Sequence, residues 1–142
     1  MREVKIGIIG MGTVGCGVYN VISKEGEYIA HKEGLKLTVK SVYSRHYHID
    51  LPDEIKAQSP EAIIADPEID IICELIGGIE PANTIIKNAL AAKKTVVTAN
   101  KQLVASNWAE LEAEARKSGA GLYFEASVGG GIPCLRAVTD SL

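Results

Sequence analysis

The chain has 142 residues, of which 46% are hydrophobic and 23% charged, and its formal net charge is −3 at pH 7. This length suits one domain with its own core, and the weakly negative charge gives no basic footprint for nucleic acid. No apolar run is long enough to cross a membrane, no signal-peptide pattern precedes the first strand, and Cys16, Cys73 and Cys134 form no CxxC pair, so we expect reduced, buried thiols in a cytoplasmic protein.

The first expected element is a buried strand, Val4–Ile9, which leads through a glycine-rich turn into a helix over Thr13–Glu25. In the GMGTVG sequence of the turn, Gly10 permits a sharp bend, Gly12 removes a side chain where backbone must approach phosphate, and Gly15 lets the helix pack close to the strand. The helix N-terminus adds free N–H groups for an anion. The pattern predicts a dinucleotide-binding turn, and its alternative is a glycine turn kept only for packing.

A polar connection over Gly26–Gly34 is expected to lead into a second strand, Leu35–Val42, which is followed by Ser44 and Arg45. A site that prefers NAD usually has an acidic residue here to accept from the ribose 2′-hydroxyl, whereas an arginine suits the 2′-phosphate of NADP. No acid stands between residues 35 and 49. Ser44 and Arg45 therefore favour NADP, although NAD remains open and Arg45 could also be a solvated loop residue.

The rest of the chain alternates helices and strands. The expected elements are a short helix from Ser59–Pro60, a strand over Ile69–Ile76, a helix from Glu80–Pro81, a strand over Thr95–Thr98, a helix capped by Asn107 and Glu110 and ended by Gly119, a strand over Leu122–Glu125, and a helix from Ile132–Pro133. This order predicts an α/β fold of the Rossmann type, a doubly wound and mainly parallel sheet with helices on both faces. Such sheets bind ligands at the carboxyl ends of their strands.

Three charged residues fall at or near these strand ends. Lys101 is the only basic side chain expected beside a nicotinamide, where it could polarise a carbonyl or transfer a proton, or it could be a plain surface lysine. Glu74 lies within an apolar strand and must be either paired or functional, because an unpaired buried carboxylate is costly. Glu125 precedes a loop rich in backbone carbonyls and could hold a cation or cap a helix.

Four segments together resemble the homoserine dehydrogenase family, in the family's order and spacing. They are Gly10–Val18, Glu74–Ala82, Val96–Lys101 and Phe124–Pro133, and they extend over nearly the whole chain. The resemblance implies a reversible, NAD(P)-dependent interconversion of L-homoserine and L-aspartate 4-semialdehyde, in the route to threonine, methionine and isoleucine.

The resemblance also implies roles for single residues. The glycine turn with Thr13 and Val14 would cradle the pyrophosphate, and Arg45 would meet the adenosine ribose or its phosphate. Ile76 and Gly77 would border the cofactor, and Lys101 would be the catalytic residue beside nicotinamide and substrate. A sodium ion would be held by the Glu125 carboxylate and by the backbone carbonyls of Val128, Gly130 and Ile132.

We expect residues 1–131 to form the NAD(P)-binding domain and residues 132–142 to begin the helix that leads to a substrate and dimerisation domain. On this interpretation the chain is part of a longer enzyme, a homodimer or homotetramer, and turns over little homoserine alone. Two other functions stay open: an amino-acid dehydrogenase such as one acting on aspartate, and a regulatory module that senses NADPH without chemistry.

Overall fold

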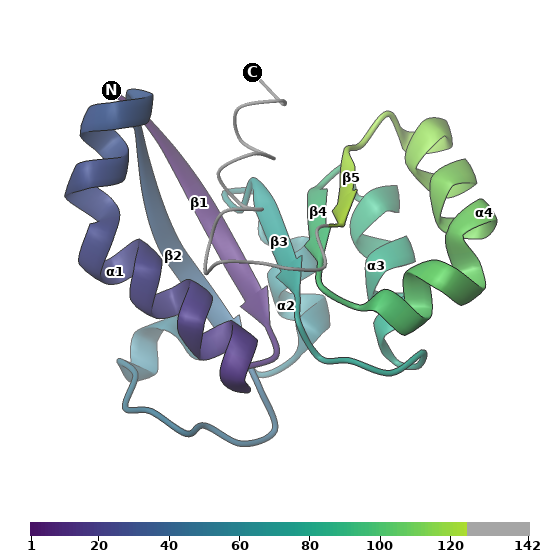
Figure 1. Cartoon of the computed structure of the whole chain (residues 1–142), viewed down its shortest axis with the longest axis horizontal. Helices are drawn as coiled ribbons and strands as arrows, with labels where there is room; N and C mark the ends of the chain where they lie inside the picture. Colours follow the sequence, from purple (N-terminus) through teal and green to yellow (C-terminus); the bar gives the residue numbers. More distant parts are fainter. Residues whose placement is uncertain (125–142) are drawn as a thin grey trace.

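The computed structural model describes residues 1–124, which form a single five-stranded sheet in the order β2-β1-β3-β4-β5 (Figure 1). Every pair of neighbouring strands is parallel. The strands are β1 (Arg2–Ile9), β2 (Leu35–Tyr43), β3 (Ile71–Glu74), β4 (Thr95–Thr98) and β5 (Leu122–Phe124). The predicted Rossmann-type α/β fold is therefore confirmed, although β3 is shorter than the strand expected over Ile69–Ile76.

The helices divide the core into two layers, one on each face of the sheet. On one face, α1 (Thr13–Glu33) packs Val18, Ile22 and Ile29 against apolar residues of β1 and β2. On the other face, a second cluster joins the sheet to α2 (Pro60–Ala65), α3 (Ala82–Ala91) and α4 (Lys101–Ser118). Figure 1 shows α1 beside β1 and β2, while α3 and α4 accompany β4 and β5. Within the described part of the chain, no helix has the length and hydropathy needed to span a bilayer.

Helix α1 runs eight residues further than expected, so the polar connection predicted over Gly26–Gly34 is wrong. A glycine inside a helix costs only about 1 kcal/mol relative to alanine. Burial of Ile29, which is 4% exposed and lies two turns beyond Ile22 on the same face, offsets that cost. The helix ends at Gly34, whose positive φ of 70° lets its N–H donate to the Ala30 carbonyl at 2.9 Å.

Helix α4 also begins earlier than expected, because Asn100 rather than Asn107 caps it. The Asn100 side chain accepts a hydrogen bond from the Leu103 N–H at 3.1 Å. Asn107 instead marks a kink with φ −125° and ψ 17°, and its amide donates to Glu110. The predicted end at Gly119 is confirmed by its left-handed conformation, and the predicted cap at Ser59 by its bond from Ala62 N at 3.2 Å.

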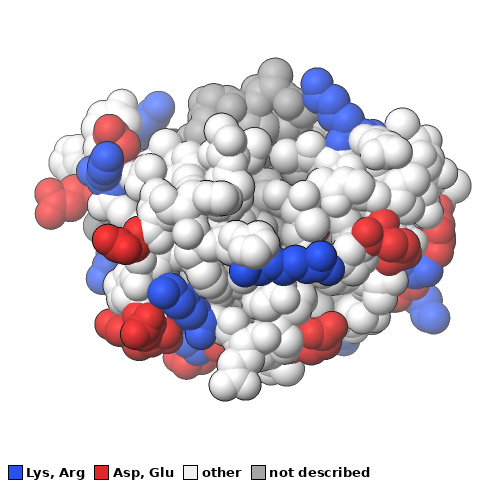
Figure 2. Space-filling model, turned by 90° about the horizontal axis from the view of Figure 1, so that it is seen from below, with Lys and Arg blue, Asp and Glu red and all other residues white. Residues whose placement is uncertain are grey.

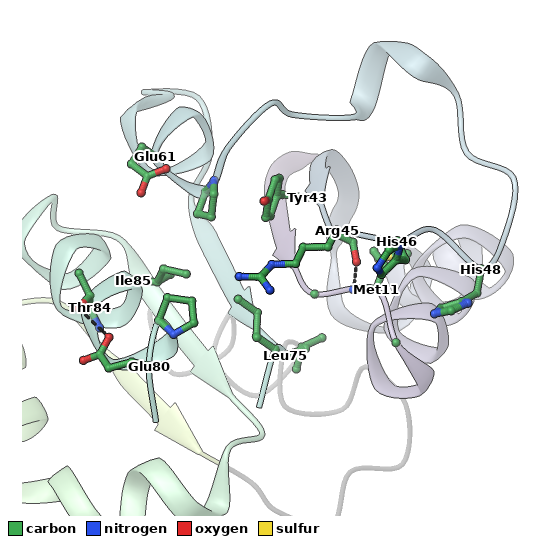
Figure 3. Close-up of a pocket in the computed structure, with 16 residues that line it drawn as sticks. Met11, Tyr43, Arg45, His46, His48, Glu61, Leu75, Glu80, Thr84 and Ile85 are labelled. Carbon is green, nitrogen blue, oxygen red and sulfur yellow. Dashed lines mark hydrogen bonds between the residues drawn. The ribbon is translucent and has the colours of Figure 1, made fainter. Parts of the chain in front are cut away.

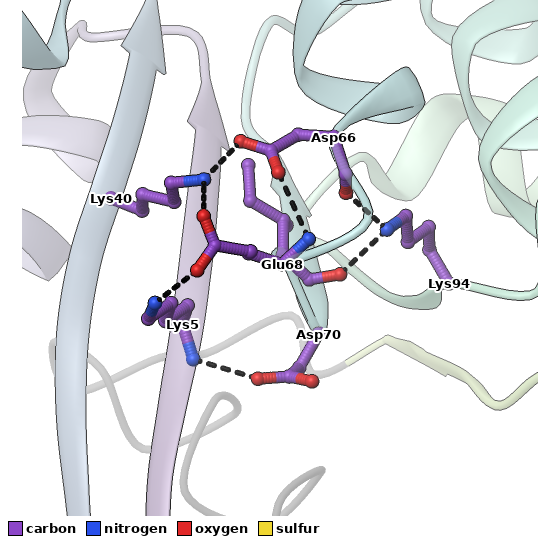
Figure 4. Close-up of polar contacts among 7 residues, drawn as sticks. Lys5, Lys40, Asp66, Glu68, Asp70 and Lys94 are labelled. Carbon is purple, nitrogen blue, oxygen red and sulfur yellow. Dashed lines mark hydrogen bonds and ion pairs between the residues drawn. The ribbon is translucent and has the colours of Figure 1, made fainter.

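Lysines from two strands meet the acidic connection between α2 and β3 (Figure 4). Lys40 of β2 contacts Asp66 at 2.5 Å and Glu68 at 2.8 Å, and Lys5 of β1 contacts Glu68 at 2.7 Å. The buried Lys94 donates to the carbonyls of Asp66 and Ile69 from the other side. This charge cluster holds the α2–β3 connection, which leads into the start of β3, against β1 and β2.

The hydrogen bond from Lys40 holds the pKa of Asp66 below its usual range, and bonds from Lys40 and Lys5 do the same for the pKa of Glu68. A carboxylate whose pKa is lowered by folding stabilises the fold above its unfolded pKa and loses that contribution as the pH falls through the folded pKa. We therefore expect Lys40→Met to lower the Tm by a few degrees at pH 7. The difference from wild type should shrink below about pH 4, where carboxylates become protonated. Thermal unfolding from pH 7 to pH 3 measures this, and a difference independent of pH would contradict it.

Candidate functional site

The turn between β1 and α1 uses its three glycines in three different ways. Gly10 has φ 104°, and a Cβ there would lie 2.7 Å from the backbone of Leu75. A Cβ on Gly15 would lie 2.0 Å from the Gly10 carbonyl oxygen, so only glycine lets α1 approach the turn. A Cβ on Gly12 would meet no atom within 4 Å. Gly10 and Gly15 are thus required by packing, while the space beside Gly12 is open to a ligand.

Two hydrogen bonds fix the turn against the end of β2. The Gly10 N–H donates to the Tyr43 carbonyl at 2.8 Å, and the Met11 N–H reaches the Ser44 hydroxyl at 3.4 Å. Ser44 in turn donates its own N–H to the Tyr47 hydroxyl at 3.2 Å. Ser44 was predicted as a cofactor-binding residue, and the structure shows that it also positions the glycine turn.

A cavity of about 620 Å³ opens beside this turn (Figure 3). Residues of the turn, the end of β2, the start of α2 and the connection from β3 to α3 all contribute to its walls. They are Gly10, Met11, Gly12, Tyr43, Ser44, Arg45, His46, His48, Pro60, Glu61, Leu75, Ile76, Glu80, Pro81, Thr84 and Ile85. Figure 3 shows the Arg45 side chain extending from the end of β2 into this space, over Leu75. The cavity is large enough for a substantial part of a nucleotide.

The structure brings half of the predicted cofactor-binding residues to the walls of this cavity. Gly10, Gly12, Ser44, Arg45 and Ile76 line it. Thr13 and Val14 lie just beside it, exposed in the first turn of α1. Gly15 is buried beneath the turn, and Gly77 is exposed in the connection after β3 with φ 87°.

The first turn of α1 is suited to an anion. It holds no acidic residue, and its cap, Gly12, has no side chain to accept from the free backbone N–H groups. Helix N-termini of this kind attract phosphate through those N–H groups and the helix dipole. Figure 2, which views the edge where the strands end, shows basic side chains across the middle of a largely uncharged surface, with acidic side chains mainly towards its margins.

Sequence reasoning missed the far wall of the cavity, which comes from α2 and the start of α3. Glu80 accepts from the Thr84 hydroxyl at 2.8 Å and from the Asn83 amide at 3.3 Å. The bond from Thr84, followed by that from Asn83, holds the pKa of Glu80 below its usual range despite some desolvation. The sequence offers one sign of the bond between Glu80 and Thr84, a glutamate followed four residues later by a threonine at a helix start. This pattern does not indicate a cavity.

Lys101 lies apart from this cavity, at the first position of α4, where it is exposed. It borders a smaller apolar cavity of about 200 Å³ that extends from Thr98 to Ala105 and includes Phe124. Asn100, directly before it, donates its side-chain N–H to the Gly78 carbonyl. The structure therefore places Lys101 at the end of β4, beside the glycine-rich connection that follows β3.

The two acidic residues singled out in the sequence have different outcomes. Glu74 is fully buried and paired, accepting from the Thr98 hydroxyl at 2.7 Å and from the Ile76 N–H at 2.8 Å. Glu125 and the other expected sodium ligands, Val128, Gly130 and Ile132, lie outside the described residues. Among residues 1–124 no group of three or more His, Cys, Asp or Glu side chains is arranged to hold a metal ion.

Similarity to known proteins extends over nearly the whole described part of the chain. Residues 10–125 match the family model described as "Homoserine dehydrogenase, NAD binding domain". Homoserine dehydrogenases from Bacillus subtilis and Synechocystis are 40% and 38% identical to the chain, over 100% and 98% of its length. The chain covers 34% and 33% of these proteins, so it spans about a third of the length of the curated relatives.

Solved structures agree with the sequence comparison. A homoserine dehydrogenase from Thiobacillus denitrificans is 38% identical and superimposes with a TM-score of 0.80, covering 100% of this chain and 34% of that one. A hyperthermophilic archaeal homoserine dehydrogenase in complex with NADPH is 27% identical with a TM-score of 0.72, covering 93% of this chain and 46% of that one.

Proposed function

The chain belongs to the homoserine dehydrogenase family, and on this premise we propose that it is the NAD(P)-binding part of an enzyme that interconverts L-homoserine and L-aspartate 4-semialdehyde. Such an enzyme would serve the synthesis of threonine, methionine and isoleucine. The observation that carries the proposal is the glycine turn, whose open side at Gly12 lies beside a cavity of about 620 Å³. The cavity spans the ends of β1, β2 and β3, which is where open parallel sheets bind nucleotides.

The residues present fit a dinucleotide laid across the sheet. The pyrophosphate would bind the free N–H groups at Gly12, Thr13 and Val14. The adenosine half would lie over β2, where Arg45 enters the cavity and suits the 2′-phosphate of NADP. Because β2 and β3 flank β1 on opposite sides, the nicotinamide half would lie towards Gly77 and Lys101. A bound NADPH in the archaeal relative supports this choice of cofactor.

The nicotinamide supplies the hydride acceptor or donor, and the protein supplies orientation and proton handling. On this proposal Lys101 Nζ would hydrogen-bond the reacting oxygen of homoserine. During oxidation it would accept the hydroxyl proton, and in the reverse direction it would polarise the aldehyde and return that proton. Its exposure at the first position of α4 leaves it accessible to a substrate.

The test is an assay of the enzyme that contains this chain, with L-homoserine and either NADP or NAD. Reduction of NADP upon addition of L-homoserine is the expected result. No turnover of homoserine with either cofactor would overturn the proposal. Turnover of L-aspartate instead would assign the chain to a different amino-acid dehydrogenase, and nucleotide binding without any turnover would favour a sensor.

The assignment of Arg45 predicts a change in cofactor preference. Arg45→Asp should weaken NADPH binding by about tenfold or more, because a hydrogen-bonded charge pair contributes about 1.5–3 kcal/mol and would be replaced by repulsion. NADH, which lacks the 2′-phosphate, should lose much less. Titration calorimetry of both nucleotides measures this, with Lys36→Asp, an equal charge change at the other end of β2, as the control. Equal losses for NADPH and NADH would exclude Arg45 from the 2′-phosphate site.

A further inference from the structure

Glu74 is the most buried charged residue of the described chain, and the proposed hydride and proton transfer gives it no direct part. Its exposed fraction is 0%, and it stands at the end of β3, beside the site. None of the ion pairs among residues 1–124 includes it. Burying a carboxylate costs folding free energy unless hydrogen bonds compensate for its lost hydration. The hydrogen-bond partners of Glu74 therefore indicate its role.

Glu74 is the acceptor in both of its hydrogen bonds. The Asn100 N–H donates to the Thr98 hydroxyl oxygen at 3.1 Å, which leaves the hydroxyl proton free to donate to Glu74 Oε1 at 2.7 Å. The Ile76 N–H donates to Glu74 Oε2 at 2.8 Å. Glu74 is therefore the common acceptor for two donors, Ile76 in the connection after β3 and Thr98 at the end of β4.

A second set of bonds from Asn100 closes the network. Its side-chain N–H donates to the Gly78 carbonyl, and its side-chain oxygen accepts from Leu103 N at 3.1 Å, which starts α4. The connection after β3 is thus held at two points, Ile76 and Gly78. Gly77 and Gly78 have φ values of 87° and 74°. Glycine adopts such values readily but is not restricted to them, so the hydrogen bonds at Ile76 and Gly78 are needed to fix the connection.

The network joins the two groups assigned to the nicotinamide half of the site. One is Gly77, which lies between the bonded residues Ile76 and Gly78, and the other is Lys101, which follows Asn100 directly at the start of α4. Residues that hold the adenosine half, such as Arg45 and Ser44, take no part in these bonds. Any effect of the network on binding should therefore fall on one half of the dinucleotide.

We propose that Glu74 is a positioning residue which, through Thr98 and Asn100, holds the connection after β3 and the start of α4 in the one arrangement that receives the nicotinamide. This inference rests on the proposed binding of NADP(H). Glu74 acts through its partners and would not touch the reacting atoms itself. Its charge makes it a strong acceptor for both donors at once, which a neutral amide at the same position is not.

The test compares two ligands that share the adenosine half. Titration calorimetry on this chain measures dissociation constants for NADPH and for adenosine 2′,5′-bisphosphate, which lacks the nicotinamide. In Thr98→Val and in Glu74→Gln the affinity for NADPH should fall by about fivefold or more, as loss of one or two hydrogen bonds implies, while that for the bisphosphate stays within about twofold. Thr98→Ser keeps the hydroxyl and should retain both wild-type affinities.

The outcomes separate positioning from plain stability. Circular dichroism and the Tm identify the variants that fold. If Thr98→Val does not fold, Glu74→Gln, which preserves side-chain volume, carries the test. Equal losses for the two ligands, no loss for either, or a Thr98→Ser variant that behaves like Thr98→Val would each overturn the inference. If the wild-type chain binds neither ligand, the proposed cofactor site itself is wrong and the inference falls with it.

Discussion

Replacing Gly15 by alanine is expected to destabilise the fold, whereas replacing Gly12 by alanine is expected to leave the fold intact and remove nucleotide binding. The Cβ on residue 15 would lie 2.0 Å from the Gly10 carbonyl oxygen, a backbone atom that cannot rotate away. Overpacking of this kind costs about 1–3 kcal/mol or more, and relief requires α1 to move off the sheet. The Tm of Gly15→Ala should fall by several degrees, as thermal unfolding followed by circular dichroism would measure.

Gly12→Ala is the matched variant in the same turn. Its Cβ would meet no protein atom within 4 Å, and its φ of −80° suits alanine. Its Tm should therefore stay within about 2 °C of wild type, since surface substitutions rarely exceed about 0.5 kcal/mol. The added methyl group would occupy the space assigned to the pyrophosphate, so NADPH affinity should fall by about tenfold or more. Wild-type affinity in Gly12→Ala would place the pyrophosphate elsewhere.

The second large effect is expected from Lys101→Ala in the homoserine dehydrogenase that we propose this chain belongs to. A positioned proton-transfer group contributes about 10²–10⁴-fold to rate, so kcat for homoserine oxidation should fall by about hundredfold or more. The Tm should change little, because Lys101 is exposed at the start of α4, takes part in none of the ion pairs or side-chain hydrogen bonds of the described chain, and alanine is a good helix former. Steady-state kinetics with NADP and L-homoserine measures the effect.

Lys117→Ala is the control, since it removes the same charge from an exposed position at the other end of α4. It should leave kcat and the KM for homoserine unchanged. If Lys101→Ala turned over at the wild-type rate, Lys101 would not take part in the chemistry. If it lost NADPH binding to the same extent as turnover, its role would be in holding the cofactor.

The sequence predicted the architecture well because β3, β4 and β5 are short and largely apolar, while β2 alternates apolar with polar residues. It failed at two helix boundaries, for different reasons. Burial of Ile29 extends α1 through Gly26, and the bonds of Asn100 to Leu103 and Gly78 move the start of α4 forward. Neither contact can be inferred from local periodicity.

The candidate site was predictable where it depends on backbone shape and not where it depends on packing between distant elements. The roles of Gly10 and Gly15 follow from the spacing of the glycines, and the structure confirms both. The places of Glu61 and Glu80 in the cavity wall do not follow from the sequence, because they depend on how α2 and α3 pack against the end of β2. The sequence left open whether Glu74 is paired or functional, and only the contacts to Thr98 and Ile76 show its pairing.

The strand order has one more consequence, for the way the chain could be divided. Residues 1–58 supply β1, α1 and β2, residues 59–124 supply the other strands and helices, and within the described chain the two segments share strand pairing only between β1 and β3. The boundary between them is exposed at Gln58, and the large cavity takes its walls from both segments. Two fragments cut there would meet between β1 and β3, next to the proposed nucleotide site. By mass action the ligand would then strengthen their association, which is the arrangement a two-fragment sensor of nucleotide concentration requires.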